Sequence, residues 1–214
     1  MVKFIAIFTM LLAHIGYLYF PDSTFLGVIG RFAFPLFAWG ITVGFRNSKN
    51  HTKYMVRVLV LAIVSQYPYF LVFEHSYLNV CFTLFAGMVI LKLYTSSLNK
   101  WFKLVNIVLI FIIADICSFE YGMYGLATIL VFYIYRLKPI SILPHIGITL
   151  MGIYFYKYSL IQMYSLFSIL ILMLLHKYDF KINRWVSYAF YPLHLILFVL
   201  LDYFNIVSPI SLFR

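Results

Sequence analysis

The stretch that decides the fold is residues 2–20, VKFIAIFTMLLAHIGYLYF. It carries one charge, Lys3, and it has the length that a helix needs to cross about 30 Å of hydrocarbon, about 20 mostly apolar residues. The rest of the chain has the same character, because 64% of its 214 residues are hydrophobic and only 10% are charged. A soluble domain of this size cannot bury so much apolar surface, so we expect an integral membrane protein.

Further apolar runs follow to the end of the chain, separated by short turn sequences. With the first run they predict nine helices, near residues 2–20, 26–45, 55–73, 78–94, 101–118, 121–135, 140–158, 160–175 and 185–204. We therefore predict an all-α fold, a polytopic transmembrane helical bundle of about nine helices, in which residues 1–214 form a single integral membrane domain.

The basic residues predict the orientation of this bundle. Most of the 16 Lys and Arg residues fall in alternate loops, such as 46–57, 92–103 and 177–184. Because basic loops stay in the cytoplasm, we expect the N-terminus inside the cell and the C-terminus outside. The formal net charge of +10 then reflects topology and contact with anionic membrane lipid, and it requires no nucleic acid as a partner.

Several polar side chains interrupt the apolar runs, although a polar group that faces lipid is costly. Counting 1.5 Å per residue from Lys3 puts His14 about 16 Å along the first helix, in the outer half of the membrane. The same counting assigns a set of polar residues to that layer: His14, Arg31, Gln66, Asn79, Thr83, Asp115, Glu120 and His194. An internal cavity that opens outward is the cheapest arrangement, so we expect His14, Arg31 and His194 to line one site.

Each of these residues also has a structural interpretation. A histidine can bond to a neighbouring helix, and Gln66 with Asn79 can join two helices. A buried guanidinium without a partner would be too costly, so we expect Arg31 to pair with Asp115 or Glu120. We interpret the remaining histidines as structural: His51, His75, His145 and His176. Local zinc-binding spacing is absent, so we predict no metal site.

Six quoted segments carry a resemblance to a known family. They are LLAHIG (11–16), IGRFAFPLFAWGITVGFRNSKN (29–50), SQYPYFL (65–71), LNVCFTL (78–84), EYGMYGLATIL (120–130) and FYPLHLILF (190–198). In order and spacing they resemble the TraX family of bacterial membrane proteins, over nearly the whole chain. That family is known for acetylation of the pilin amino terminus, and it is grouped with membrane acyltransferases that use cytoplasmic acyl-CoA.

The resemblance implies an acyltransferase, most simply an acetyltransferase, in the bacterial cytoplasmic (inner) membrane. Its co-substrate would be acetyl-CoA or another acyl-CoA, with no permanently bound cofactor, and its acceptor a peptide or glycan at the outer face. Matching positions assign His14, Arg31, His194 and, as the acid of the EYG sequence, Glu120 to catalysis. They assign the remaining matches to substrate binding: Gln66, Asn79, Thr83 and Tyr121. Asp115 is not a matched position, and we add it as a second acid because it lies in the same layer.

One departure from the family pattern concerns the residue before the first histidine. The family has an aspartate there, and this chain has Ala13. Three readings stay open: Asp115 or Glu120 orients His14, His14 is less basic than its relatives, or the chain has lost acetyl transfer. The last reading favours a non-enzymatic membrane component or partner of a secretion or conjugation apparatus.

Acyl transfer fits these residue types on chemical grounds as well. Moving an acyl group from a thioester to an amine or hydroxyl needs a base and stabilisation of a developing oxyanion. His14 suits the first role, and Arg31 suits the second. The phosphates of CoA could bind a basic loop whose residues also satisfy the positive-inside rule: Arg46, Lys49, Lys53 and Arg57.

Overall fold

The computed structural model describes residues 1–74, 76–178 and 183–204, and within these ranges it is all-helical, without strands. The α-helices are α1 (Val2–Tyr19), α2 (Thr24–Asn47), α3 (His51–Phe73), α4 (Val80–Thr95), α5 (Lys100–Ile116), α6 (Gly122–Tyr135), α7 (Ile142–Phe155), α8 (Phe167–Leu175) and α9 (Arg184–Tyr203). The predicted all-α class and the predicted count of about nine helices are confirmed. His75 lies outside the described residues.

Three short 3₁₀ segments join or extend these helices: η1 (Pro139–Ser141), η2 (Leu160–Leu166) and η3 (His176–Tyr178). The prediction for residues 160–175 was a continuous α-helix, but its first seven residues form η2. Ser159 precedes this segment and accepts a hydrogen bond from the backbone N–H of Ile161 at 3.4 Å. A 3₁₀ run of this length is uncommon, because its hydrogen-bond geometry is poorer than that of an α-helix.

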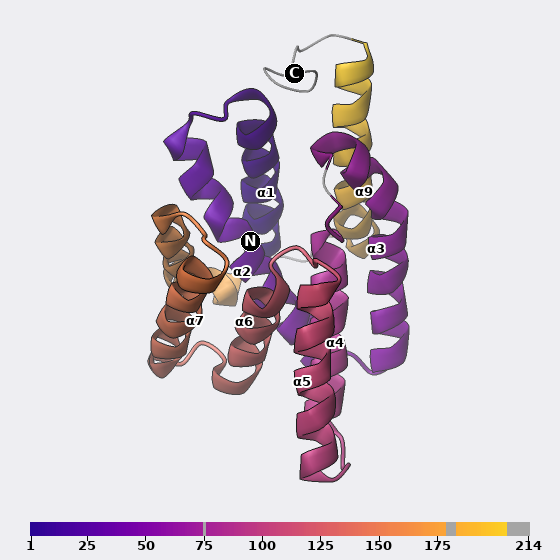
Figure 1. Ribbon diagram of the computed structural model, residues 1–214, viewed down its shortest axis with the longest axis vertical. Coiled ribbons are helices and arrows are strands. Elements are labelled where there is room, and N and C mark those ends of the chain that lie inside the picture. The colour runs from indigo at the N-terminus through magenta and orange to yellow at the C-terminus, as the bar shows by residue number, and fades with distance from the viewer. Residues whose placement is uncertain (75, 179–182, 205–214) are drawn as a thin grey trace. The chain divides into compact units, whose positions relative to one another are not determined.

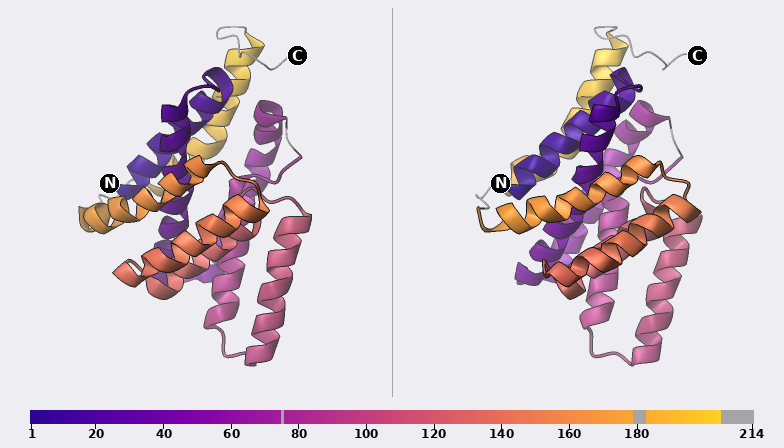
Figure 2. Two further views of the ribbon diagram at one scale, coloured as in Figure 1. Left: turned by 60° about the vertical axis from the view of Figure 1, so that its left-hand side comes forward. Right: turned by 90° about the vertical axis from the view of Figure 1, so that its left-hand side faces the viewer.

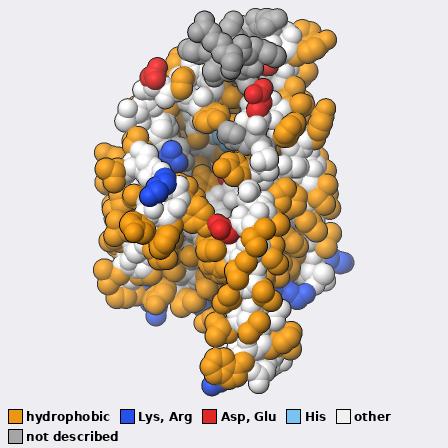
Figure 3. All heavy atoms as spheres, in the orientation of Figure 1, with side chains coloured by type: hydrophobic (Ala, Val, Ile, Leu, Met, Phe, Trp, Pro, Cys, Tyr) orange, Lys and Arg blue, Asp and Glu red, His pale blue; other side chains and the backbone are white. Residues whose placement is uncertain are grey.

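Five segments of the described ranges are long and apolar enough to cross a membrane: Val2–Tyr19, Thr24–Asn47, His51–Phe73, Leu160–Tyr178 and Trp185–Tyr203. Shorter apolar helices cover Val80–Thr95, Gly122–Tyr135 and Pro139–Phe155. Hydrophobic side chains cover most of the face seen in Figure 3, and charged groups are few on it. This surface is typical of a protein whose solvent is lipid. The orientation with the N-terminus inside stays a prediction.

The chain divides into two compact units. The terminal unit combines Met1–Phe37 with His145–Arg214, and the central unit is Ala38–Pro144. The boundary near residue 37 falls inside α2, so that helix contributes its first half to the terminal unit and its second half to the central unit. The prediction of a single integral membrane domain is not tested by this division.

Small residues bring α1 and the first half of α2 together in the terminal unit. A Cβ atom added at Gly16 would lie 2.7 Å from Cβ of Leu26, and one added at Gly30 would lie 2.8 Å from Cβ of Ala13. The two backbones can approach this closely only because these positions lack large side chains. α1 also contacts α8 and α9, and α9 lies beside it in both views of Figure 2.

In the central unit, α4 packs against α3, α5 and α6. A Cβ atom added at Gly87 of α4 would lie 2.4 Å from Cδ1 of Ile129 on α6, so this contact also depends on a glycine. Its core includes the buried residues Ala86, Ile90, Ala114 and Leu126. Figure 1 shows α4 and α5 as a long antiparallel pair.

Candidate active site

A pair of histidines joins α1 to α9 in the terminal unit. Nδ1 of His14 lies 2.8 Å from Nε2 of His194, although the two residues are 180 positions apart in the sequence. Their rings are nearly parallel, with 12° between the planes and 5.0 Å between the centroids. Phe198 packs edge-on against both rings, at 6.5 Å from His14 and 5.8 Å from His194. The prediction that the first and last helices are neighbours is confirmed.

The hydrogen bonds of this pair determine where its protons lie. Nδ1 of His194 is 2.9 Å from the carbonyl oxygen of Phe190, which can only accept, so this nitrogen carries a hydrogen. In the neutral ring, Nε2 of His194 therefore holds the lone pair, and it accepts the hydrogen of His14 Nδ1. The same reasoning puts the lone pair of neutral His14 on Nε2. The chain of bonds thus runs in one direction, from His14 through His194 to a backbone carbonyl.

Ala13 faces α2, because its Cβ lies against Gly30 where the two helices cross. One of the three readings of the sequence made Asp115 or Glu120 the group that orients His14. The ring partner in the structure is instead His194. Asp115 belongs to α5 of the central unit, where its side chain is exposed.

Arg31 in α2 has a partner that the sequence did not predict. Its Nη1 donates to Oε1 of Gln162 at 3.3 Å, and its Nε is buried with no hydrogen bond. The expected partner was an acid, Asp115 or Glu120, and the side chain that meets Arg31 here is a neutral amide. Gln162 is 2% exposed, and η2 holds it in place.

A sequence signal for Gln162 was present. Polar residues recur every three positions along this segment, at Gln162, Ser165 and Ser168, and all three side chains are buried. Positions three apart lie on one face of a helix, and they eclipse one another in a 3₁₀ segment. A polar face on an otherwise apolar span therefore indicates that residues 160–168 direct this polar face toward the protein and not toward lipid.

Gln66 and Asn79 form a closed network in the central unit. Oε1 of Gln66 accepts from the backbone N–H of Asn79 at 3.0 Å and from its Nδ2 at 2.8 Å. Asn79 also donates to the carbonyl of Ala62 at 2.8 Å and accepts from the N–H of Cys81 at 3.0 Å, which caps α4. Nε2 of Gln66 donates to the carbonyl of Tyr77 at 2.9 Å. These bonds join α3 to the start of α4, as in the structural interpretation.

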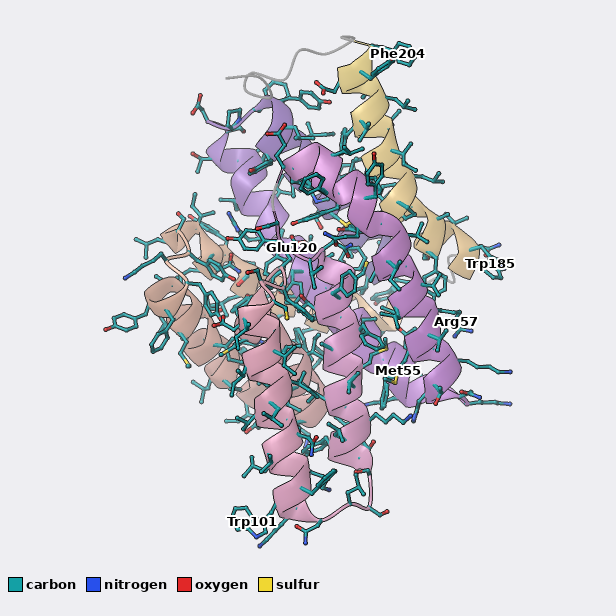
Figure 4. The ribbon with its side chains drawn as sticks, turned by 45° about the vertical axis from the view of Figure 1, so that its right-hand side comes forward. Met55, Arg57, Trp101, Glu120, Trp185 and Phe204 are labelled. Carbon is teal, nitrogen blue, oxygen red and sulfur yellow. The ribbon has the colours of Figure 1, made fainter. Side chains whose placement is uncertain are left out.

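Glu120 lies in the turn between α5 and α6, outside both helices. Its backbone N–H donates to the carbonyl of Leu78 at 2.8 Å, and the hydroxyl of Thr83 donates to the carbonyl of Glu120. Figure 4 shows Glu120 at one end of the α4–α5 pair and Trp101 at the other. Tyr121 precedes α6 with a φ of 66°, and Gly122 begins the helix with a φ of 40°. The EYG sequence therefore makes a tight turn that fixes Glu120 beside α4.

The carboxyl group of Glu120 is held away from water. Its Oε2 is buried without a hydrogen bond. Burial raises the pKa of Glu120 to about 7, although hydrogen bonds from the backbone N–H of Val80 and from Tyr69 act in the opposite direction. This carboxyl group therefore changes its charge near neutral pH.

The basic loop predicted for residues 46–57 is shorter in the structure, because Arg46 lies in the last turn of α2, Lys53 and Arg57 lie in α3, and only Lys49 lies between the two helices. Nη2 of Arg46 donates to the carbonyls of Phe132 and Tyr133 at the end of α6, and its guanidinium lies 4.5 Å from the centroid of the Tyr133 ring. Lys49, Lys53 and Arg57 are exposed. These three basic residues are thus accessible to a phosphate, whereas Arg46 stabilises the last turn of α6. In the ranges that the structure describes, no group of three His, Cys, Asp or Glu residues could hold a metal ion.

Similarity to known proteins identifies the family of this chain. The family model described as TraX protein matches residues 1–202. The chain is 30% identical to a protein of Dichelobacter nodosus named probable fimbrial assembly protein FimC, serogroup H1. This match covers 57% of the chain, and the chain spans about half of that relative, 56% of its length. No solved structure matches. With a family match over nearly its whole length, the chain belongs to the TraX family.

Proposed function

We propose that this TraX-family protein is a membrane acyltransferase. It would take an acyl group, most simply acetyl, from cytoplasmic acyl-CoA and transfer it to a peptide or glycan acceptor at the outer face. The observation that carries the proposal is the directional pair of His14 and His194. A histidine whose Nδ1–H is held by a second group presents a basic Nε2, which is the arrangement that a general base needs.

In the proposed reaction, Nε2 of His14 takes the proton of the acceptor N–H or O–H while the acceptor attacks the thioester carbonyl. The resulting imidazolium is stabilised through its Nδ1–H bond to His194. Negative charge develops on the carbonyl oxygen, and in this proposal Arg31 stabilises it. When the C–S bond breaks, the proton on His14 passes to the departing CoA thiolate, so that base and charge are restored.

The name of the Dichelobacter relative suggests which acceptor to test first. That protein is named for fimbrial assembly, so a fimbrial subunit peptide with a free amino terminus is the first acceptor of choice. The partners of the present TraX-family protein would then be acyl-CoA, membrane lipid and this peptide. The exposed Lys49, Lys53 and Arg57 supply positive charge for the phosphates of CoA.

The test is transfer of labelled acetyl from acetyl-CoA to such a peptide by the purified protein in detergent. We expect His14→Ala to lower kcat/KM by about 1000-fold and to leave the thermal unfolding midpoint unchanged. Wild-type protein that neither transfers nor slowly hydrolyses acetyl-CoA would contradict the proposal. Full activity of His14→Ala would remove His14 from the mechanism and leave His194 as the candidate base.

The second candidate function is a non-enzymatic component of a fimbrial or conjugation apparatus. It is favoured by the central unit, where Gln66, Asn79 and Arg46 bond to the protein itself. The two candidates differ in a host strain whose fimbriae depend on this protein. If a His14→Ala strain still assembles its fimbriae fully, the result supports the structural role. If the fimbrial subunit loses its acetyl group in that strain, the result supports the acyltransferase.

A further inference from the structure

Arg31 has an unusual partner for a half-buried cation. A guanidinium keeps its charge at all relevant pH values, and inside a protein that charge normally meets a carboxylate. Here the hydrogen bond goes to the neutral Gln162, and the buried Nε has no bond within the described residues. Within the described residues of the terminal unit, the guanidinium of Arg31 therefore has one hydrogen bond, to a neutral group, and one buried N–H donor without a bond.

The neutral partner has a specific consequence. A carboxylate at position 162 would hold the guanidinium equally well, but it would also cancel most of its attraction for a second anion. The carboxamide of Gln162 directs the guanidinium without neutralising it. Gln162 is itself almost fully buried in η2, so its carboxamide has a defined place beside Arg31.

We propose that Gln162 is a positioning residue that keeps Arg31 available as the receptor of an oxygen anion. The ligand would be a carboxylate or phosphate oxygen, or the oxyanion that develops during acyl transfer. The binding part of this inference stands by itself, whereas its kinetic part rests on the proposed acyltransferase function.

Anion binding is measured first, because it needs no turnover. Purified protein in detergent is unfolded by heat in 50 mM sodium phosphate, in 50 mM sodium acetate, and in sodium chloride of matched ionic strength. We expect phosphate or acetate to raise the wild-type midpoint by about 2–4 °C over chloride, as for a ligand well above its Kd. Which of the two acts more strongly distinguishes a phosphate group from a carboxylate. The absence of a shift with both anions overturns the proposal.

Two substitutions at position 162 distinguish positioning of Arg31 by Gln162 from a hydrogen bond that only holds two segments together. Gln162→Glu keeps the acceptor for Arg31 and adds a negative charge, so we expect it to retain the wild-type midpoint in chloride and to lose the anion shift. Gln162→Met removes the acceptor and keeps the volume, so we expect a lower midpoint with part of the anion shift retained. If the pair served only to hold helices, the shift would be absent in the wild type or would persist unchanged in Gln162→Glu, and either result overturns the proposal.

Gln66→Glu is the matched control, because it places the same new carboxylate in the closed network of the central unit. It removes the donor to Tyr77 and should lower the midpoint while the anion shift stays as in wild type. Should Gln162→Glu fail to fold, Arg31→Gln takes its place and should also lose the shift. A retained shift in Arg31→Gln contradicts the inference.

The kinetic arm applies where acetyl transfer is observed. We expect Gln162→Glu to lower kcat by about 100-fold and to leave KM for the acceptor within about threefold, because the oxyanion forms only in the transition state. Gln162→Met should keep more activity than Gln162→Glu despite its lower stability. If activity instead follows the unfolding midpoint through the series, Gln162 is structural. An inactive wild-type protein that still shows the anion shift refutes the proposed enzyme and retains the anion site.

Discussion

The polar residues of the central unit and those of the terminal unit are organised in different ways. In the central unit, Gln66 and Asn79 satisfy each other and the ends of two helices through bonds of 2.8–3.0 Å. In the terminal unit, the bonds of His14 and His194 run in one direction and put the lone pair of His14 on Nε2, while Arg31 donates to a neutral amide. A network closed on itself stabilises a fold, whereas a directed chain or an uncompensated charge can act on a ligand.

The first way to break this comparison is to remove the positioning histidine. His194→Ala should lower kcat for acetyl transfer by about 100-fold with little change in KM, because His14 loses the acceptor that fixes its tautomer. His194→Gln supplies a new acceptor oxygen and should recover part of the loss. His176→Ala is the matched control, since His176 makes the same bond to the carbonyl four residues earlier, to Leu172 at 2.9 Å. Equal loss in both alanine variants would contradict a directed role for His194.

The closed network should show the opposite behaviour. Asn79→Ala leaves the Ala62 carbonyl and the Cys81 N–H without this partner in a fully buried place, and we expect it to cost about 2–3 kcal/mol of unfolding free energy. The Asn79→Ala molecules that remain folded should keep the wild-type kcat for acetyl transfer. Asn99→Ala removes an exposed cap at α5 and should cost less than about 1 kcal/mol. A normal midpoint with a lost kcat in Asn79→Ala would assign Asn79 to substrate binding after all.

The α1–α2 crossing gives a third test. Ala13→Asp restores the family residue, yet the new carboxyl group would meet α2 at Gly30, where Ala13 already makes close contact. We expect a loss of about 2 kcal/mol in stability and no gain in acetyl transfer. Thermal unfolding and kcat measured side by side check this. Higher activity in the Asp variant would show that a carboxylate orients His14 better than His194 does.

The smallest effect concerns the turn of the central unit. Because the pKa of folded Glu120 is raised to about 7, from an ordinary value of 4.5, the folded state binds this proton more tightly than the unfolded state. Its contribution to stability is therefore greatest below pH 4.5 and falls as the pH rises from there to about 7. Glu120→Gln should flatten this dependence and gain about 1 kcal/mol at pH 8. Unfolding free energies of the wild type and of Glu120→Gln, measured between pH 5 and 8, test this prediction. If the pH dependence of stability has the same slope in both proteins, Glu120 does not titrate as a buried group.

The sequence was sufficient for the membrane class and for the helix count, because apolar runs of span length have few alternative structures. It was also sufficient for the meeting of His14 and His194, since both lie in apolar helices where an isolated imidazole is costly. It did not predict Gln162, because a single amide near a helix start has no distinctive spacing until the buried serines are read with it. It proposed an acid as the partner of Arg31, and as one of three readings for His14, on the basis of charge. A neutral imidazole or amide can accept the same hydrogen bond at short range.

The 3₁₀ segment η2 also bears on membrane thickness. Read as a continuous α-helix, Leu160–Tyr178 would be about 28 Å long, but with η2 and η3 in the tighter helix it reaches about 33 Å. The extra length matters in a bilayer whose hydrocarbon core is about 30 Å thick. A 3₁₀ segment turns 120° per residue and an α-helix 100°, so its conversion to α-helix would rotate Gln162 by about 100° relative to Phe167. In a thinner bilayer that favours the shorter form, Gln162 would turn away from Arg31, so lipid composition could govern this contact.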